Sequence, residues 1–453
     1  MTPGARPLPR LRAPFYGWWM VALTIVINGM GSGPIWSGVG IWVKALEGPM
    51  GWSRTQLTGA FSLAQLEGSF VGPALGYLTD RFGSRHMVLM GMLIIGGGFM
   101  LFSYTTNLAM FYVAYSIIMF GAAAGTYLPL MTSVNRWFVR KRGIAMAVAG
   151  EGYFIGGVAL VPILAWAVNP DLHGWEVTSR GIGIVFLAIA WPISRLIRNS
   201  PEEYGLRPDG DPPSRGPEVD APSGTAAPTA TWGDAPDFTA REAMRTASFW
   251  LISLGHGLCA MMIATMSVHM VPMLTDQGLS LQMASYVWAA AMAVGAGSAL
   301  LGGYVGDRVP KHLALFVFAT IQGAGFTLAV GVDSAATGFL FAAVFGFGNG
   351  GRNPLVTAIR GDYFGKRAFA TITGISTAPL YILTLVAPLF AAALFDIRES
   401  YTIPFSVLGA LGLFSGFLFL MARKPAYPAR PGVAPRTARD RANAANVRRS
   451  DVH

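Results

Sequence analysis

Arg352 is the residue of this sequence whose type and position most directly indicate binding chemistry. It lies inside a long apolar stretch, eight residues before Arg360, a spacing that corresponds to about 12 Å along a helix. An unpaired charge at that depth in an apolar segment is costly, and a guanidinium can bind a carboxylate through two parallel hydrogen bonds. We therefore predict that Arg352 and its neighbour Asn353 bind an anion. The alternative is a structural arginine paired with a neighbouring helix.

Four other polar residues lie within apolar stretches. Glu151 can pair with Arg352, titrate as a proton-coupling acid, or bond to a nearby backbone or hydroxyl group. Glu67 is a second candidate for proton coupling. His269 is a candidate for binding the ligand or a proton, and Tyr127 is a candidate for facing the same cavity as Arg352. For each of them, the alternative is a packing residue whose polar groups are satisfied locally.

A turn motif occurs twice between apolar stretches. Residues 76–81 and 303–308 both read G-Y-x-x-D-R, and a glycine next to an acid–base couplet favours a tight, charged turn at a membrane surface. We expect these residues to act in gating, with two arginines after the fourth apolar stretch as partners of Asp80. The gating candidates are Gly76, Asp80, Arg81, Gly83, Arg85, Arg140, Arg142, Asp307 and Arg308.

The elements that must position these residues are apolar helices. The chain has 453 residues, of which 53% are hydrophobic and 12% are charged, whereas soluble domains carry about 25% charged residues. Continuous apolar runs of about 20 residues cross a bilayer as helices. We predict an all-α membrane protein with twelve spans at about 16–43, 58–79, 86–105, 109–135, 143–168, 180–198, 248–273, 281–305, 312–331, 336–359, 368–394 and 402–422.

One long connector divides the spans six plus six. Residues 199–247 are rich in Pro, Gly, Ala, Asp and Thr, a composition typical of a flexible linker. The predicted organisation is an N-terminal tail (1–14), a six-helix bundle (15–198), the linker (199–247), a second six-helix bundle (248–422) and a basic, disordered tail (423–453).

The two six-helix units are related by an internal repeat. Gly121, Gly125 and Pro129 in the fourth span recur with the same spacing as Gly346, Gly350 and Pro354 in the tenth, which makes Tyr127 the counterpart of Arg352. The G-x-x-x-G spacings there and at 72/76 predict helix contacts, and the glycines and proline around Arg352 predict a kinked or opened helix. Because six is even, the halves are parallel repeats that bind ligand between them.

Positive charges predict the orientation in the membrane. With the N-terminus inside, 28 lysines and arginines fall on the cytoplasmic side and four on the outside, namely Lys44, Arg54, Arg180 and Arg398. Cytoplasmic loops are enriched in Lys and Arg, so both termini are expected in the cytoplasm and the protein in the plasma (inner) membrane.

Several classes of function are not supported. The single cysteine, Cys259, lies in an apolar run, so neither an internal disulfide nor a metal site is expected. The net charge of +10 comes from residues beside membrane spans, which favours a topological origin over nucleic-acid binding. No nucleotide-binding motif or catalytic constellation is present, so we expect neither an enzyme nor a cofactor.

The turn motif gives the chain a resemblance to a known family. Gly76, Asp80, Arg81, Gly83 and Arg85 match the G-x-x-x-D-R-x-G-x-R signature of the major facilitator superfamily, and the copy after the eighth span is a weaker match. The resemblance extends over all twelve spans. It implies the major facilitator fold, in which spans four and ten line a central cavity.

Finer features resemble the bacterial monocarboxylate and oxalate–formate porter branch. These features are Gly51-Trp52-Ser53-Arg54, Arg136-Trp137-Phe138, the segment 201–210, His269 with Pro272, and Asp362-Tyr363-Phe364-Gly365. One departure is that residues 281–302 carry no charge, although carboxylate porters of that branch commonly place a basic residue in the eighth span.

These observations predict a secondary transporter that works by alternating access. The expected substrate is a small organic anion, a monocarboxylate, moved with or without a proton by a monomer in the lipid bilayer. Two alternatives are export of a larger amphipathic compound and a receptor that does not transport. A receptor would need a signalling domain, for which the linker and the tails are short and poor in apolar residues.

Overall fold

The computed structural model describes residues 15–211, 238–365 and 368–426, and the side chains of 64–70, 73 and 370 lie outside that description. The predicted tails 1–14 and 427–453 therefore lie outside the described residues, as does the middle of the linker. The helices are α1 (Tyr16–Gly31), η1 (Ser32–Ser37), α2 (Val39–Met50), α3 (Arg54–Phe102), α4 (Leu108–Gly125), α5 (Tyr127–Trp137), α6 (Arg142–Gly150), α7 (Gly152–Ala167), α8 (Gly174–Leu196), η2 (Glu202–Tyr204), η3 (Pro208–Gly210), α9 (Ala240–Met244), α10 (Ala247–Asp276), α11 (Leu281–Gly306), α12 (Lys311–Leu328), η4 (Ala329–Gly331), α13 (Ala335–Phe364), α14 (Phe369–Ser376), α15 (Ala378–Arg398) and α16 (Thr402–Met421).

The helices form the predicted twelve spans. Ten segments of the described part are long and apolar enough to cross a membrane. The other two spans are the first part of α3, where several side chains are not described, and the glycine-rich α13, which carries two arginines. Helices suit a bilayer because every backbone group is satisfied within the segment. Side-chain caps begin many of them, at Ser53, Asn107, Thr246, Ser280 and Ser334.

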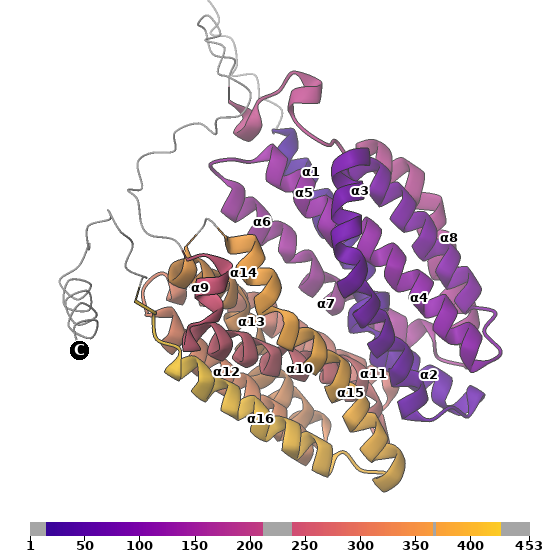
Figure 1. Ribbon diagram of the computed structural model, residues 1–453. Helices are drawn as coiled ribbons and strands as arrows, with labels where there is room; N and C mark the ends of the chain where they lie inside the picture. The colour runs from indigo at the N-terminus through magenta and orange to yellow at the C-terminus, as the bar shows by residue number, and fades with distance from the viewer. Residues whose placement is uncertain (1–14, 212–237, 366–367, 427–453) are drawn as a thin grey trace, which may run out of the picture.

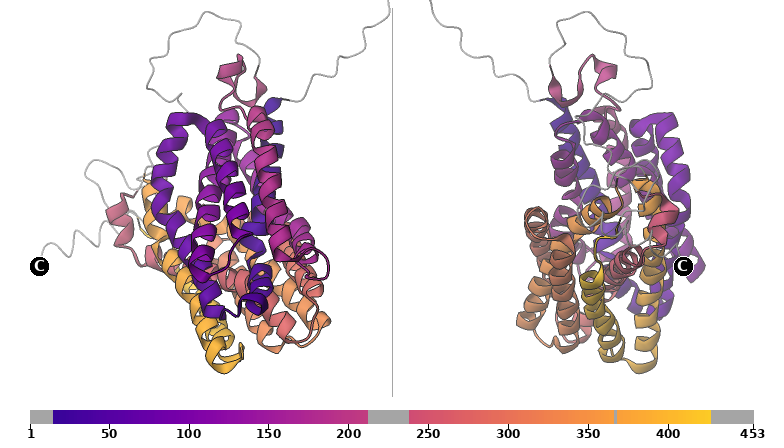
Figure 2. Two further views of the ribbon diagram at one scale, coloured as in Figure 1. Left: turned by 90° about the vertical axis from the view of Figure 1, so that its right-hand side faces the viewer. Right: turned by 60° about the vertical axis from the view of Figure 1, so that its left-hand side comes forward.

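The spans gather into two bundles, one from each half of the chain. Figures 1 and 2 show α1–α8 (indigo to magenta) beside α10–α16 (salmon to yellow). Within each bundle, glycines allow helix backbones to touch. An added Cβ at Gly125 would lie 2.6 Å from Gly91 Cα, and one at Gly350 only 1.9 Å from Gly295 O. The predicted contact faces at 121/125 and 346/350 are confirmed, whereas Gly72 and Gly76 have open space around them.

Helix interruptions do not all fall where the sequence suggested. Gly83 (φ 79°, ψ 154°) divides α3 into the second and third spans, in a backbone region that favours glycine. Thr126 (φ −108°, ψ −101°) separates α4 from α5. By contrast, α13 runs from Ala335 to Phe364 with Pro354 inside it, so of the kinked or opened helix predicted around Arg352 the opened form is wrong, and a kink stays a prediction. The break lies in the fourth span, not in its repeat partner.

The two described ends of the linker contact the bundles. Asp209 accepts hydrogen bonds from the backbone N–H groups of Val139, Arg140 and Lys141 at 2.7–3.2 Å. Phe238 N–H donates to Phe364 O at 3.1 Å and its ring is 2% exposed. Both described parts of the linker thus pack against a bundle.

The linker defines the two ends of the molecule. We call the end that carries 197–211 and 238–246 the linker side, and the end that carries 51–53, 277–280 and 399–401 the opposite side. The halves meet through α7 against α11, α3 against α15 and α2 against α10. In every hydrogen bond between described residues of the two halves, the residue of the second half is 276, 282, 288, 396 or 401. The halves are therefore joined toward the opposite side.

Candidate functional site: a cavity between the halves and the polar groups around it

A cavity of about 160 Å³ lies between the two halves. Helices η1, α2, α3, α4 and α7 of the first half face α10 and α15 of the second across it. A molecule held there would contact both halves at once. The lining residues are Ile35, Trp36, Val39, Phe61, Tyr115, Met119, Tyr153, Ala260, Ile263, Ala264, Ser267, Val268 and Thr384.

The cavity lining is mostly apolar and contains no charged side chain. The hydroxyl groups of Tyr115, Ser267 and Thr384 each donate to a main-chain carbonyl, at 2.8, 2.8 and 2.9 Å. Those hydrogens are therefore already used, and the hydroxyl oxygens remain as acceptors. The lining suits the apolar part of a small molecule, and the donors that remain in it, the Trp36 indole N–H and the Tyr153 hydroxyl, are neutral.

The residues predicted to bind the ligand lie outside this lining. Tyr127 begins α5 with its side chain 62% exposed, and its hydroxyl makes no hydrogen bond to a described residue. Asn353 is also exposed, whereas His269 and Arg352 are buried. The structure thus brings none of the four into the cavity wall.

Arg352 is buried among helices of the second half. Its side chain is 3% exposed. Nε donates to Gln322 Oε1 at 3.0 Å, Nη2 lies 3.5 Å from Asn349 Oδ1, and the buried Nη1 has no hydrogen-bond partner. No acidic side chain among the described residues pairs with it, so the pairing with Glu151 considered from the sequence is not present in the described part. Among the described residues, no negative charge neighbours its positive charge.

The two predicted proton-coupling acids are placed differently. Glu151 is half-buried at the junction of α6 and α7, and its carboxylate makes no hydrogen bond to a described residue. Glu67 lies within α3, but its side chain lies outside the described part. Among the residues that the structure describes, no group of three His, Cys, Asp or Glu side chains could hold a metal ion.

His269 is connected to the opposite side by a directional hydrogen-bond chain. Its Nε2 lies 2.9 Å from Pro388 O and its Nδ1 lies 2.9 Å from the Tyr401 hydroxyl. Because a carbonyl only accepts, Nε2 carries the proton. Arg54 Nη1 donates to the same hydroxyl at 2.8 Å, which leaves the hydroxyl hydrogen for Nδ1. The chain therefore runs from Arg54 through Tyr401 to a neutral His269 and on to Pro388.

An ion-pair cluster, which we call the lock, joins the two halves on the opposite side. Its centre is Arg54, which is 2% exposed. Arg54 Nε lies 2.8 Å from Glu47 and Nη1 lies 2.6 Å from Asp276. Lys44 lies 3.1 Å from Glu47 and 3.0 Å from Asp276. Because Asp276 belongs to the second half and the others to the first, these bonds hold the halves together.

Asp396 of the second half completes the lock at the start of α3, and the ring of Phe395 packs against it. The carboxylate of Asp396 accepts from the backbone N–H groups of Arg54 and Thr55, both at 3.0 Å, and an acid at a helix N-terminus is stabilising. The Arg54 guanidinium lies 3.8 Å from the centre of the Phe395 ring. We use the name lock for Lys44, Glu47, Arg54, Asp276, Asp396 and Tyr401.

On the linker side, ion pairs form within a half or with the linker. Asp80 pairs with Arg136 at 3.1 Å, so the partner predicted from the sequence was wrong. Arg140 binds Asp211 of the linker, and Arg142 Nε donates to Phe138 O at 3.1 Å. In the second half, Lys311 lies 2.6 Å from Asp362. None of these bonds joins the two halves.

The remaining motif residues lie around the turn within α3 and at the C-terminal end of α11. Gly83 forms the turn, and the N–H of Arg85 donates to Asn199 Oδ1 at 3.0 Å. Arg81 and Asp307 are exposed. Arg308 is also exposed and donates to Tyr304 O at 3.2 Å. The structure confirms a charged turn at the linker side, and a gating role remains a prediction.

A third polar cluster brings together Arg360 of α13 and His256 of α10, a contact that the sequence did not predict. Arg360, counted among the connector charges, is 2% exposed within α13. Its Nη2 lies 2.9 Å from His256 Nδ1 and its Nε donates to Ser376 Oγ at 3.0 Å. Arg54 was likewise counted as a loop charge. In both cases most of the partners are far away in the sequence, so spacing alone gave little signal.

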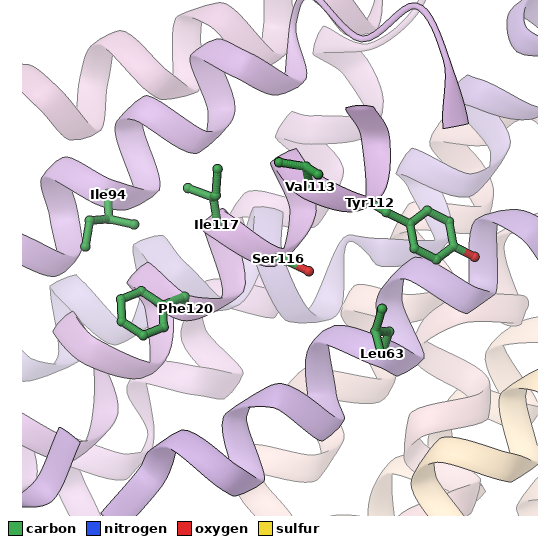
Figure 3. A pocket seen from close by; sticks show the side chains of 7 residues that line it. All are labelled: Leu63, Ile94, Tyr112, Val113, Ser116, Ile117 and Phe120. Atoms are coloured by element: carbon green, nitrogen blue, oxygen red, sulfur yellow. The ribbon is translucent and has the colours of Figure 1, made fainter. Parts of the chain in front are cut away.

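Two larger hollows lie away from the interface between the halves. One of about 420 Å³ is lined by α3 and α4 residues, among them Leu63, Val113 and Phe120, with Ser116 as a polar member (Figure 3). The other, of about 430 Å³, lies among α1, η1, α7 and α8. Leu63 and Val113 are 47% and 54% exposed, as expected of side chains that face lipid. These hollows involve one half only.

Comparisons with known proteins agree with this architecture. The model of the Major Facilitator Superfamily matches residues 39–335 and 301–451. Monocarboxylate transporter 11 of Homo sapiens is 26% identical over 414 residues, covering 89% of this chain and 82% of that protein. The oxalate:formate antiporter of Oxalobacter formigenes is 26% identical over 179 residues, covering 39% of this chain and 42% of that protein. The branch resemblance inferred from short motifs is thus supported over most of the chain.

A solved structure shares the fold. The bacterial homologue of the human lysosomal transporter Spinster, in an inward-facing and unoccupied conformation, superimposes with a TM-score of 0.66 at 14% identity, covering 93% of this chain and 99% of that one. Together with the family match, this likeness confirms two six-helix repeats around a central interface. The chain belongs to the Major Facilitator Superfamily and is a membrane transporter.

Proposed function

We propose that this transporter moves a small organic anion, a monocarboxylate, by alternating access. The observation that carries the proposal is the buried Arg352, whose Nη1 has no partner and which pairs with no acid among the described residues. A buried cation without a counter-ion is strongly unfavourable. An anionic substrate that passes nearby supplies the missing negative charge for part of the transport cycle.

The size and chemistry of the cavity support a small substrate. Pockets for drug-sized ligands measure about 300–1,000 Å³, whereas the cavity between the halves measures about 160 Å³. An apolar lining accommodates a short hydrocarbon end, while the carboxylate finds its donors outside the lining. Relatives named monocarboxylate transporter and oxalate:formate antiporter agree with this chemistry.

The arrangement of the halves supports a conformation open toward the cytoplasm. We place the linker side and both termini in the cytoplasm of a monomer in the plasma (inner) membrane, since 28 lysines and arginines lie on that side of the predicted topology. The lock then closes the outer side, and no hydrogen bond joins described residues of the two halves on the inner side. The gating motif residues would restore closure there in the alternate state.

The predicted site residues keep their proposed roles around this path. Tyr127 and Asn353 are exposed and can meet the substrate when the linker side is open. His269 directly follows Ser267 and Val268 in the sequence, and these two residues line the cavity. Glu151 and Glu67 are the proposed acids for proton coupling.

Uptake into proteoliposomes tests the proposal. We expect the protein to accumulate radiolabelled L-lactate, pyruvate or acetate, and Arg352→Ala to abolish binding of the transported anion. Arg352→Lys should restore binding poorly, because lysine lacks the planar pair of donors. The double variant Glu151→Gln with Arg352→Gln is the control for a purely structural pairing.

Three outcomes would contradict the proposal. Folded wild type that moves none of the carboxylates would exclude the substrate class. Unchanged affinity in Arg352→Ala would remove Arg352 from the anion path. Uptake that is lost in each single variant but recovered in the double variant would show that Arg352 serves only to pair with Glu151.

A further inference from the structure

Arg360 is a second buried arginine without a neighbouring acid. Its side chain is 2% exposed, Nε donates to Ser376 Oγ at 3.0 Å and Nη2 lies 2.9 Å from His256 Nδ1. Nη1 makes no hydrogen bond to a described residue, and no ion pair of Arg360 is found in the part of the chain that the structure describes. The positive charge is therefore held in place by neutral groups.

The contact with Arg360 fixes which nitrogen of His256 carries the proton. A guanidinium has donors only, so Nδ1 of His256 must accept the bond from Nη2. In the neutral ring the proton then resides on Nε2, which becomes a donor. The pair therefore presents two donors, Arg360 Nη1 and His256 Nε2, and no acceptor. Such a pair is complementary to an anion and would repel another cation.

The position of His256 links this pair to the cavity. Ala260, Ala264 and Ser267 of α10 line the cavity, and His256 precedes Ala260 by four residues on the same helix. Residues spaced by three or four share one helix face. His256 thus lies about 6 Å, slightly more than one turn, from Ala260 along α10 toward the linker side. It is only half-buried, which leaves its ring reachable.

We propose that Arg360 and His256 form a carboxylate-binding site at the linker-side approach to the cavity. The carboxylate accepts one bond from Arg360 Nη1 and one from His256 Nε2, while the apolar end of the molecule points along α10 into the cavity. This site rests on the proposed function, since it names the group that recognises the charge of a monocarboxylate. It also explains why the cavity lining itself needs no charge.

The donor pattern favours a monocarboxylate over a more highly charged anion. The site offers two donors, one charged and one neutral, which match the two oxygens of a carboxylate. An oxyanion such as phosphate has more acceptor oxygens than these donors can satisfy. Bonds from a charged donor are shorter and roughly twice as strong as neutral ones, so Arg360 supplies the charge of this site and His256 supplies its second donor.

Equilibrium binding to the purified full chain tests the site. Isothermal titration would use acetate, L-lactate and pyruvate, with lactamide as the uncharged counterpart of lactate. We expect wild type to bind at least one carboxylate and to bind lactamide at least tenfold more weakly. Arg360→Gln and His256→Leu should each lower carboxylate affinity about tenfold. Arg195→Gln removes an exposed linker-side charge that stacks on Trp191 at 4.8 Å and should change nothing.

A conservative variant separates recognition from packing. His256→Gln keeps an oxygen that can accept from Arg360 and a nitrogen that can donate outward, so its carboxylate affinity should stay within threefold of wild type. Carboxylate affinities that remain at the wild-type value in both Arg360→Gln and His256→Leu would overturn the site and leave the proposed function standing. Folded wild type that binds no carboxylate would overturn both. If Arg360→Gln does not fold, His256→Leu decides alone.

Discussion

The two ends of this transporter connect their charged side chains in different ways. On the opposite side, Arg54 and Lys44 of the first half bind Asp276 of the second. On the linker side, Asp80 binds Arg136 within the first half, and Lys311 binds Asp362 within the second. Ion pairs therefore join the two halves at one end, whereas at the other end they form within each half. Closing the linker side would require these charges to change partners.

Burial also distinguishes the two ends. Arg54 is 2% exposed, whereas the side chains of Arg136 and Asp80 are 36% and 73% exposed. Exposed ion pairs contribute about 0–1 kcal/mol, while breaking a buried pair costs about 3–5 kcal/mol. The lock should therefore dominate the preference for this conformation, and the linker-side pairs should be easy to exchange.

The largest effect is expected from Arg54→Gln. It leaves Glu47 and Asp276 with only the more exposed Lys44 between them, at a cost of about 3 kcal/mol, since these acids are 26% and 28% exposed. That cost would shift the halves apart on the opposite side. Spin labels at residues 48 and 277, which are exposed, should report a longer and broader distance distribution.

Lys44→Gln is the matched control for Arg54→Gln. Lys44 contacts the same two acids, but its side chain is 32% exposed, so we expect less than about 1 kcal/mol and little change in the distance. Equal effects of the two variants would mean that burial of Arg54 does not set the strength of the lock.

A smaller effect is expected from Tyr401→Phe. The variant removes the hydroxyl between Arg54 and His269 but keeps the ring stacked 4.6 Å from Phe395. A buried acceptor left unsatisfied costs about 1–3 kcal/mol, so the melting temperature should fall and the label distance should lengthen slightly. Tyr363→Phe loses a 2.8 Å bond to Ala422 O on the linker side and should leave that distance unchanged. A wild-type melting temperature in Tyr401→Phe would argue against the hydrogen-bond chain.

Asp80→Asn should separate rate from stability. The pair with Arg136 is exposed, so its loss changes the stability of this conformation by less than about 1 kcal/mol. Transport should nevertheless slow, because Asp80 is the proposed acceptor when the linker side closes. Initial uptake rates and melting temperatures of the same preparations check both statements. Uptake at the wild-type rate would refute the gating role.

The smallest effect is expected where the linker meets the first half. In the wild type, the Lys141 N–H donates to Asp209 Oδ1 at 3.2 Å. In Asp209→Asn, the amide oxygen can still accept from Val139 and Arg140, but the amide nitrogen, which is a donor, faces the N–H of Lys141. Asn also tolerates the positive φ of 60°. Hydrogen exchange at Lys141 should accelerate with no change at the lock. Unchanged exchange would show that this contact does not hold the linker.

The pH dependence of that contact follows from its donors. Burial alone would raise the pKa of Asp209, but three backbone N–H groups and Arg140 outweigh it and lower that pKa below the usual value. A carboxyl with a lowered pKa stabilises the folded state above its unfolded value of about 3.9. The contact should therefore be complete at neutral pH and be lost only as the pH falls through the lowered pKa.

Much of the fold could be predicted because apolar length and internal repetition are local signals. The twelve spans, the six-plus-six division and the turn at Gly83 follow from runs of residues and from spacings that recur 225 and 227 positions later. Arg352 was also recognisable, because a charge inside an apolar run is visible without knowledge of its neighbours. The break at Thr126 was not, since the glycines and the proline are shared with the unbroken α13.

The polar clusters could not be predicted because their members come from distant helices. Arg54 and Asp276 are 222 residues apart and Arg54 and Tyr401 are 347 apart, while His256 and Arg360 are separated by 104. From the sequence alone, a buried arginine near the end of a predicted span cannot be distinguished from an arginine in a loop. The acid Glu47, seven residues before Arg54, was the one local hint.

The glycine contacts described within each bundle predict how the chain tolerates mutation. A side chain at Gly91, Gly125, Gly302 or Gly350 would overlap the backbone of a neighbour in the same half, so any substitution there should prevent a bundle from assembling and lower the amount of protein in the membrane. Substitutions in the lock or at the cavity should instead yield normal amounts of inactive protein. Gly40 is an exception, because its added Cβ would lie 2.9 Å from Val268 O across the interface. In a library of variants scored for both abundance and uptake, positions that lower abundance should mark the interior of each bundle. Positions that lower uptake alone should mark the surface along which the bundles move.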